Sequence, residues 1–265
     1  MAPVTGDLAA GAGLAGPRFA AARFAAARFA TARFAIALDG PAGAGKSVLG
    51  AALAAEIDAT YVDSGIAYRA VTWDALAAGL DLHDDATLAP RAAAMDLDVA
   101  PPTCRDGRQF TVTIAGRDVT WDLRSPAVDA AVSRPSALPG VRAAVTEHLR
   151  RLAATGRVVM VGRDIGTVVL PEATLKLYVT ASAPTRARRR VADLRSRGID
   201  ADEAAVLAAI LDRDGLDSTR DTAPLRAALD AVTIETDDLT IQREVAIALA
   251  ALAGRMGLAP PEGTP

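Results

Sequence analysis

The chain has 265 residues, of which 51% are hydrophobic and 23% charged, and its net charge is −3 at pH 7. This length exceeds the usual ~100–150-residue domain, which predicts one enlarged α/β domain or a domain with an inserted lobe. The near-neutral charge argues against a general nucleic-acid binder, and no apolar run approaches the ~20 residues needed to cross a bilayer. One cysteine, Cys104, excludes an internal disulfide, and no Cys/His set has zinc spacing. We therefore expect a cytoplasmic protein without a structural metal.

The first 34 residues differ in composition from the rest of the chain. Arg-Phe-Ala recurs with a period of five residues, at Arg18, Arg23, Arg28 and Arg33. On a helix, five residues advance ~140° beyond a full turn, so successive Arg-Phe pairs spiral around the axis without forming one apolar stripe. We expect residues 1–34 to be a disordered low-complexity leader without a role in the chemistry. The alternative is an organelle or membrane-surface signal.

A glycine-rich loop follows the apolar run 34–38 and precedes the alanine-rich segment 48–57. It has the pattern G-x-x-x-x-G-K-S and consists of Gly40, Pro41, Ala42, Gly43, Ala44, Gly45, Lys46 and Ser47. Between a strand and a helix, such a loop aims backbone N–H groups and the positive end of the helix dipole at phosphate groups. The pattern predicts an ATP site in which Lys46 reaches the β- and γ-phosphates and Ser47 ligates Mg²⁺. A chance glycine-rich turn is the alternative, and the loop alone does not separate a kinase from a GTPase or a motor ATPase.

Two further predicted strands, 60–62 and 158–161, end in polar residues. The second is a continuous apolar run, as expected for a strand covered on both faces. Because the carboxyl ends of parallel strands face the ligand crevice, we expect the polar residues that follow to lie near the phosphate loop. For Asp63 and Ser64, capping of the following helix is the alternative. The residues in question are Asp63, Ser64, Tyr68, Arg69, Arg163 and Asp164.

Between these strands the alternation of predicted strands and helices is interrupted. From Leu97 onward, apolar and polar residues alternate around a turn at 115–118, which is typical of a small antiparallel sheet. We interpret about 95–125 as an inserted lobe. Two helices, 126–137 and 140–154, are predicted after it, separated by a Pro-Gly pair.

The C-terminal part begins with a predicted strand, 175–179, that leads into a basic helix. A charge run is usually a solvated face, but arginines are also what phosphoryl transfer requires, so both interpretations stay open here. Strand 232–234 and helix 241–252 are predicted to complete the sheet, and residues 255–265 to form a flexible tail. The arginines of the basic helix are Arg186, Arg188, Arg189 and Arg190.

Four motifs stand out: DGPAGAGKS at 39–47, DSGIAYR at 63–69, GRDIGT at 162–167 and Arg213-x-x-x-Asp217-x-x-Arg220 followed by Ala-Pro-Leu at 223–225. Taken together, they resemble the bacterial cytidylate kinases, over about 35–252. This resemblance implies a kinase domain at 35–254 with the P-loop nucleoside monophosphate kinase fold: a five-stranded parallel sheet with helices on both faces. The inserted antiparallel lobe would bind the monophosphate, and a helical lid would lie at about 212–222.

The resemblance also implies an activity, ATP- and Mg²⁺-dependent phosphoryl transfer to CMP and dCMP, in which Lys46 is catalytic. A carboxylate at Asp164 can accept a hydrogen bond from the cytosine amino group, which uracil lacks. The sequence departs from some relatives at Val161, where they carry an acid, and at Leu216, which replaces a lid arginine. By matching positions, Arg69, Arg163 and Arg220 would hold the acceptor phosphate, and Arg163 and Arg220 would also be catalytic. Ser133, Arg142 and Asp164 would read the base. Arg213 and Asp217 would meet the ribose, and Ser64 and Tyr68 would also contact CMP.

Three alternatives remain at this point. One is a P-loop kinase for another small acceptor, such as a different nucleoside monophosphate or shikimate. A GTPase would need [NT]-K-x-D, and neither lysine of the chain, Lys46 or Lys176, is so placed. A non-catalytic nucleotide-binding protein tethered by its basic leader is the third. We expect a monomer whose partners are ATP and CMP or dCMP, and neither nucleic acid nor a membrane.

Overall fold

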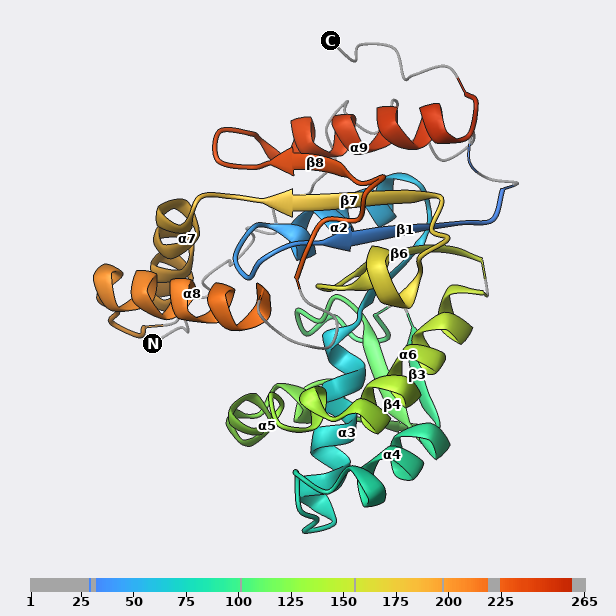
Figure 1. Ribbon diagram of the computed structural model, residues 1–265, viewed down its shortest axis with the longest axis vertical. Helices are drawn as coiled ribbons and strands as arrows, with labels where there is room; N and C mark the ends of the chain where they lie inside the picture. The colour runs from blue at the N-terminus through green and yellow to red at the C-terminus, as the bar shows by residue number, and fades with distance from the viewer. Residues whose placement is uncertain are drawn as a thin grey trace, which may run out of the picture.

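The computed structural model describes residues 29, 32–100, 102–154, 156–196, 198–218 and 225–258. Its centre is a five-stranded parallel sheet with strand order β2-β6-β1-β7-β8. Figure 1 shows β6, β1, β7 and β8 of this sheet side by side. The parallel sheet that the resemblance implies is therefore confirmed. Its strands are β1 (Phe34–Asp39), β2 (Thr60–Asp63), β6 (Arg157–Val161), β7 (Leu175–Thr180) and β8 (Val232–Glu235).

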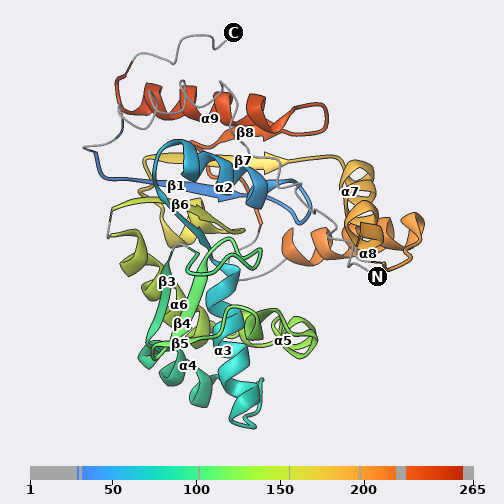
Figure 2. The same ribbon diagram turned by 180° about the vertical axis from the view of Figure 1, so that it is seen from behind.

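Strand β1 lies in the middle of the sheet and is buried on both faces. Ile36 and Leu38 pack against helices α2 (Lys46–Glu56) and α9 (Ile241–Arg255), whereas Ala37 faces the opposite side. The neighbouring strand β6 alternates in the same way, which explains its continuous apolar sequence. The sheet thus has helices on both faces, and the C-terminal helix covers the same face as the helix after the phosphate loop (Figure 2).

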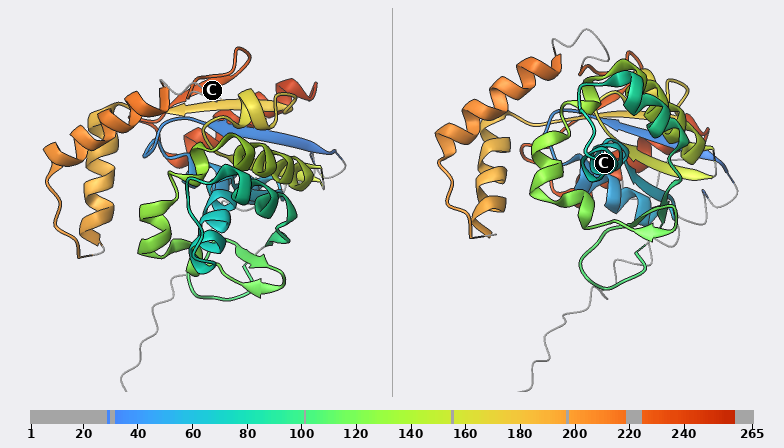
Figure 3. Two further views of the ribbon diagram at one scale, coloured as in Figure 1. Left: turned by 60° about the horizontal axis from the view of Figure 1, so that its bottom comes forward. Right: turned by 90° about the horizontal axis from the view of Figure 1, so that it is seen from below.

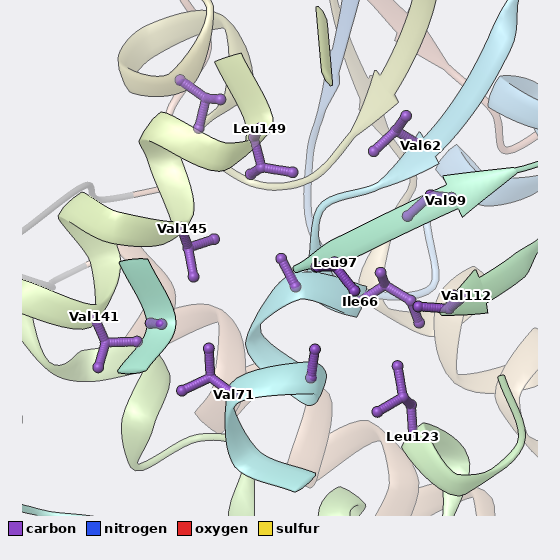
Figure 4. Packing of buried hydrophobic residues seen from close by; sticks show 14 of the residues in the cluster. Val62, Ile66, Val71, Leu97, Val99, Val112, Leu123, Val141, Val145 and Leu149 are labelled. Atoms are coloured by element: carbon purple, nitrogen blue, oxygen red, sulfur yellow. The ribbon is translucent and has the colours of Figure 1, made fainter. Parts of the chain in front are cut away.

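The opposite face carries the inserted lobe. A second, antiparallel sheet with strand order β3-β4-β5 confirms the predicted small sheet. One hydrophobic core joins it to the main sheet, with Val62 of β2, Val112 of β4 and Leu149 of α6 in the same cluster (Figure 4). The lobe is therefore packed onto the sheet and is larger than the predicted insert. Its elements are α3 (Gly65–Ala77), α4 (Asp85–Ala94), β3 (Leu97–Ala100), β4 (Thr111–Ile114), β5 (Arg117–Asp118), α5 (Pro126–Ala131), α6 (Pro139–Ala153) and two 3₁₀ turns, Asp122–Arg124 and Pro135–Ala137.

The helix predicted at 126–137 is shorter than expected. Helix α5 ends at Ala131, and a separate 3₁₀ turn begins at Pro135. Leu138 is extended, as residues before proline prefer, and Pro139 occupies the first turn of α6. Proline therefore starts this helix and does not merely separate two helices, because its missing N–H has no intrahelical partner at that position.

Helices α7 (Ala183–Ser196) and α8 (Glu203–Ser218) form a hairpin at the carboxyl end of the sheet (Figure 3). The last turns of α8 cover 212–218 of the predicted lid, whereas 219–222 lie outside the described residues. At the C-terminus, α9 continues to Arg255 and Leu258 packs against the core. The predicted tail therefore begins too early, and 259–265 lie outside the described residues. No helix in the described part of the chain is long and apolar enough to span a membrane.

The N-terminal leader is attached to the core by two of its phenylalanines. Phe29 is 2% exposed and Phe34, the first residue of β1, is 4% exposed. The centres of the two rings lie 5.9 Å apart in an edge-to-face arrangement, within the hydrophobic cluster that α2 and α9 share with the sheet. The expectation of a leader separate from the core up to residue 34 is therefore wrong for Phe29 and Phe34. Residues 1–28, 30 and 31 lie outside the described residues.

Phe29→Ala should lower the free energy of unfolding by about 3 kcal/mol, because truncating a buried phenylalanine leaves a cavity in addition to losing apolar burial. Urea unfolding measures this. The matched control is Leu229→Ala, because Leu229 is fully exposed and its truncation should change stability by less than about 0.5 kcal/mol. Equal, small effects of the two variants would mean that Phe29 does not belong to the core.

Candidate active site

The phosphate loop connects β1 to α2 as predicted, and its first glycine is required by sterics. Gly40 has φ 145°, and a Cβ there would lie 1.9 Å from the Val179 carbonyl oxygen of β7. Lys46 and Ser47 are the first two residues of α2, whose leading N–H groups have no partners within the helix. These N–H groups and the helix dipole together suit a bound phosphate.

Donors from two other elements hold the carbonyl groups of the loop. Arg186 of α7 donates to the Ala42 carbonyl at 3.3 Å, and the Thr236 hydroxyl, just after β8, donates to the Ala44 carbonyl at 3.0 Å. Arg189 in turn donates to the Thr236 hydroxyl and carbonyl at 2.9 and 2.6 Å. Donors from α7 and from the segment after β8 therefore hold two backbone carbonyl groups of the loop in place.

The basic helix divides into two faces, which resolves the question that the sequence leaves open. Arg186 is 4% exposed and Arg189 half-buried, whereas Arg188 and Arg190 are exposed. Arg186 also pairs with Asp214 of α8, at 3.0 and 2.5 Å. One guanidinium thus joins the phosphate loop to the α7–α8 hairpin, and the solvated-face interpretation holds only for the outer arginines.

The Lys46 ammonium lies in the loop and donates to the Pro41 carbonyl at 2.7 Å. Burial, followed by the nearby positive charge of Arg163, lowers the pKa of Lys46 to about 7. A phosphate group beside the ammonium would have the opposite effect, because an opposite charge favours the protonated form. The loop is therefore built for an anion.

A cavity of about 280 Å³ brings together residues from both halves of the predicted site. Five cationic side chains line it against two carboxylates, an excess of positive charge that suits a phosphate dianion. Asp63, which was expected near the phosphate loop, also lines it, and so does Ser136, which was not predicted. The predicted ATP- and CMP-binding residues that it unites are Lys46, Ser47, Ser64, Tyr68, Arg69, Ser133, Arg142, Arg163, Asp164 and Arg213.

A larger cavity, of about 450 Å³, lies between α2, the edge strand β2 and the lobe. Alanines form much of its wall, and its two charged residues, Asp58 and Arg157, pair with each other at 2.7 Å. It offers little chemistry, so the smaller, charged cavity is the candidate active site.

Three of the residues expected to bind the acceptor form one cluster. The Arg142 guanidinium donates to the Asp164 carboxylate, and both side chains are 11% exposed. The same guanidinium lies 5.7 Å from the Tyr68 ring centre and donates to the Ser136 carbonyl at 3.2 Å. The cluster forms a polar part of the cavity wall, in which Arg142 holds Asp164 by direct contact.

Arg69 is oriented by the lobe. Its guanidinium donates to the Asp129 carboxylate at 2.5 Å and to the Leu123 carbonyl at 3.0 Å. Ser64, one turn earlier, precedes α3 without a capping hydrogen bond from its side chain, and the Asp63 carboxylate accepts from the Gly65 N–H instead. The capping alternative therefore applies to Asp63 and not to Ser64.

Two predicted residues are not placed. Arg220 lies outside the described residues, as does the side chain of Asp217 in α8. Val161, where some relatives carry an acid, ends β6 beside Gly50 of α2, where a Cβ would lie 2.6 Å from the valine methyl. The departure at Val161 is thus matched by close packing against a glycine.

Sequence reasoning assigned no role to several residues that shape the site. Asp39 has a signal in the sequence, because it is the polar end of an apolar strand directly before the loop. Arg186 was considered only as one of a charge run. Thr236 has no signal, because its contact with Ala44 joins residues 192 positions apart.

The parallel sheet, the phosphate loop, the lobe and the hairpin define a P-loop kinase. The sequence matches the family model for cytidylate kinase over residues 36–253. A cytidylate kinase of Chloroflexus aggregans is 48% identical over 212 residues, covering 80% of this chain and 90% of the relative. One from Roseiflexus castenholzii is 43% identical over 219 residues, covering 82% and 93%. The chain belongs to the cytidylate kinase family.

Arg186→Met should lower the free energy of unfolding by about 2 kcal/mol, because Asp214 loses its partner in a partly exposed ion pair. The KM for ATP should rise roughly 3- to 10-fold as the loop loses a fixed orientation. Arg190→Met is the matched control, since Arg190 is exposed and, among the described residues, pairs with Asp193 of its own helix. Thermal unfolding and ATP titration measure both effects. The linkage of loop and hairpin is refuted if the two variants behave alike.

Proposed function

We propose that the enzyme transfers the γ-phosphoryl group of ATP to CMP and dCMP, giving CDP and dCDP. The observation that carries this proposal is the single cavity that joins Lys46 of the phosphate loop to the Arg142–Asp164 pair. The first group suits the donor phosphates and the second suits the polar edge of a base. The family membership of the chain supports the same acceptor.

The acceptor would lie along the wall formed by the lobe and the end of β6. Asp164, Arg142 and Ser133 would read the cytosine edge, with the carboxylate accepting from the exocyclic amino group. Arg69 and Arg163 would hold the acceptor phosphate, because guanidinium groups match its oxygens in a bidentate manner. Arg213 would meet the ribose, and we propose Asp217 and Arg220 as further contacts from the lid. Ser64 and Tyr68 complete the wall.

Phosphoryl transfer is catalysed mainly by positioning and by neutralising the charge on the transferred group. Lys46 would follow the β- and γ-phosphates, and Arg163, with Arg220, would stabilise the equatorial oxygens. Mg²⁺ takes oxygen ligands and binds through one or two protein groups together with substrate phosphates. The Ser47 hydroxyl and the Asp63 carboxylate line the cavity and fit this requirement. When bound, Mg²⁺ would offset the negative charge of the phosphates.

We further propose that the enzyme is a cytoplasmic monomer. A single chain supplies both Lys46 and the Arg142–Asp164 pair of the cavity, which supports a site formed within one subunit. The lone cysteine, Cys104, is exposed as a free thiol, which suits a reducing compartment. The substrates are small molecules, and the near-neutral net charge provides no general attraction for nucleic acid.

A coupled assay of ADP formation with CMP, dCMP, UMP, AMP and shikimate tests the function. CMP and dCMP should have the highest kcat/KM. Preference for AMP or shikimate would favour a kinase with another acceptor, and ATP binding without turnover would favour a non-catalytic nucleotide-binding protein.

Lys46→Ala should reduce kcat by about 100-fold or more, because it removes a positive charge that follows the β- and γ-phosphates into the transition state. Circular dichroism should show an unchanged fold. An unchanged kcat in this folded variant would refute the role of the loop in catalysis.

Asp164→Asn keeps the size of the side chain but removes its charge and adds donors. Loss of a charge-assisted hydrogen bond should lower kcat/KM for CMP by roughly 10- to 150-fold, while kcat/KM for UMP should fall by less or should rise. The CMP/UMP ratio is the quantity to measure. The control is Asp129→Asn, which changes the partner of Arg69 and should affect both substrates alike. If Asp164→Asn lowered kcat/KM for CMP and UMP by the same factor, Asp164 would serve only to hold Arg142.

A further inference from the structure

Asp39 is a buried acid at the point where β1 becomes the phosphate loop. It is 3% exposed, and among the described residues it is not one of those that line the cavity. Its carboxylate accepts two backbone hydrogen bonds, Oδ1 from the Ile165 N–H and Oδ2 from the Gly166 N–H, both at 2.7 Å. Burial raises the pKa of Asp39 to about 6, so the group is mainly ionised at neutral pH. A buried carboxylate with both oxygens engaged is a fixed structural contact.

The two N–H groups belong to the turn that carries the acceptor-binding residues. Arg163 and Asp164 directly precede Ile165, which begins a single π-helical turn, Ile165–Val169. The first N–H groups of a helical turn have no partners within it, and here an acid from another strand satisfies them. Asp39 therefore caps this turn from the end of β1, the strand next to β6.

The surroundings leave little room for the turn to shift. A Cβ on Gly162 would lie 2.6 Å from the Ser64 hydroxyl oxygen, and one on Gly166 would lie 3.3 Å from the Asp39 carboxylate. The Gly162 N–H also donates to the Leu38 carbonyl at 2.9 Å, one residue before Asp39. The end of β1 thus holds the backbone on both sides of Arg163 and Asp164.

The same strand end fixes the donor side. Asp39 is followed by Gly40, whose close approach to the Val179 carbonyl sets the start of the phosphate loop. We propose that Asp39 is a positioning residue for phosphoryl transfer, which sets the place of Arg163 and Asp164 relative to the phosphate loop without touching substrate. This proposal rests on the proposed function. An amide at this position provides one acceptor oxygen and turns an NH₂ group toward the second N–H, so an isosteric change removes half of the clamp.

The test is Asp39→Asn in the full chain, with Asp58→Asn as the matched control. Asp58 is an exposed partner of Arg157 at the opposite end of the sheet, and its change should leave the kinetics unaltered. For Asp39→Asn, kcat/KM for CMP should fall by about 10- to 100-fold and the CMP/UMP ratio should fall with it. The KM for ATP should stay within about 3-fold of the wild-type value. The proposal would be overturned if the KM for ATP rose by as large a factor as kcat/KM for CMP fell. It would also be overturned if the kinetics were unchanged and only the thermal midpoint were lower.

Amide hydrogen exchange gives a second readout that needs no turnover. The Ile165 and Gly166 N–H groups should exchange at least about 10-fold faster in Asp39→Asn than in the wild type, while the amides of β7 keep their protection. Unchanged exchange at these two groups overturns the clamp itself. A wild-type protein that failed to phosphorylate CMP would instead refute the proposed function, and the exchange experiment would still decide whether Asp39 holds the turn.

Discussion

The register of three parallel strands is the constraint on which the site depends. Leu38 of β1 lies opposite Val161 of β6, and Val161 lies opposite Asp63 of β2. The three strands therefore end at the same level, and the segments that leave them emerge side by side. Because a parallel sheet places all its carboxyl ends at one edge, donor and acceptor groups meet there without a long loop to bring them together. The phosphate loop, the turn at Arg163 and the start of α3 are arranged by this register.

Such a concentration of cations has an electrostatic cost that the fold offsets in parts. Asp129 balances Arg69, Asp164 balances Arg142, and each pair also orients its guanidinium group. Burial is the main reason that the pKa of Lys46 is lowered, and the nearby charge of Arg163 is the second. A site of this kind is preorganised, because the fold already holds its charges in place. A bound phosphate would offset the excess of positive charge.

Much of this arrangement could be predicted from the sequence, and the rest has identifiable reasons. The loop, the strand ends and the small antiparallel sheet follow from local patterns of apolar and polar residues, and ten predicted residues meet in one cavity. The roles of Asp39 and Arg186 depend on contacts with distant backbone groups, for which a single sequence carries no pattern. The burial of Phe29 was not predicted, because the five-residue period of the Arg-Phe-Ala repeat gives no apolar stripe on a helix. A single aromatic ring needs no such stripe to pack beside Phe34. The fold was thus more predictable than the supports of the site.

The α7–α8 hairpin differs from the lobe in the kind of force that holds it. Helix α8 has no buried side chain among those described, whereas the lobe shares a continuous apolar core with the sheet. Among the described contacts, α8 is linked to the phosphate loop by the Arg186–Asp214 ion pair, whose carboxylate is partly exposed. Dissolved salt screens a partly buried ion pair less than an exposed one, but it does not screen apolar packing at all. Ionic strength therefore acts on the two sides of the active site unequally, and weakens the contact of the hairpin with the phosphate loop more than the packing of the lobe.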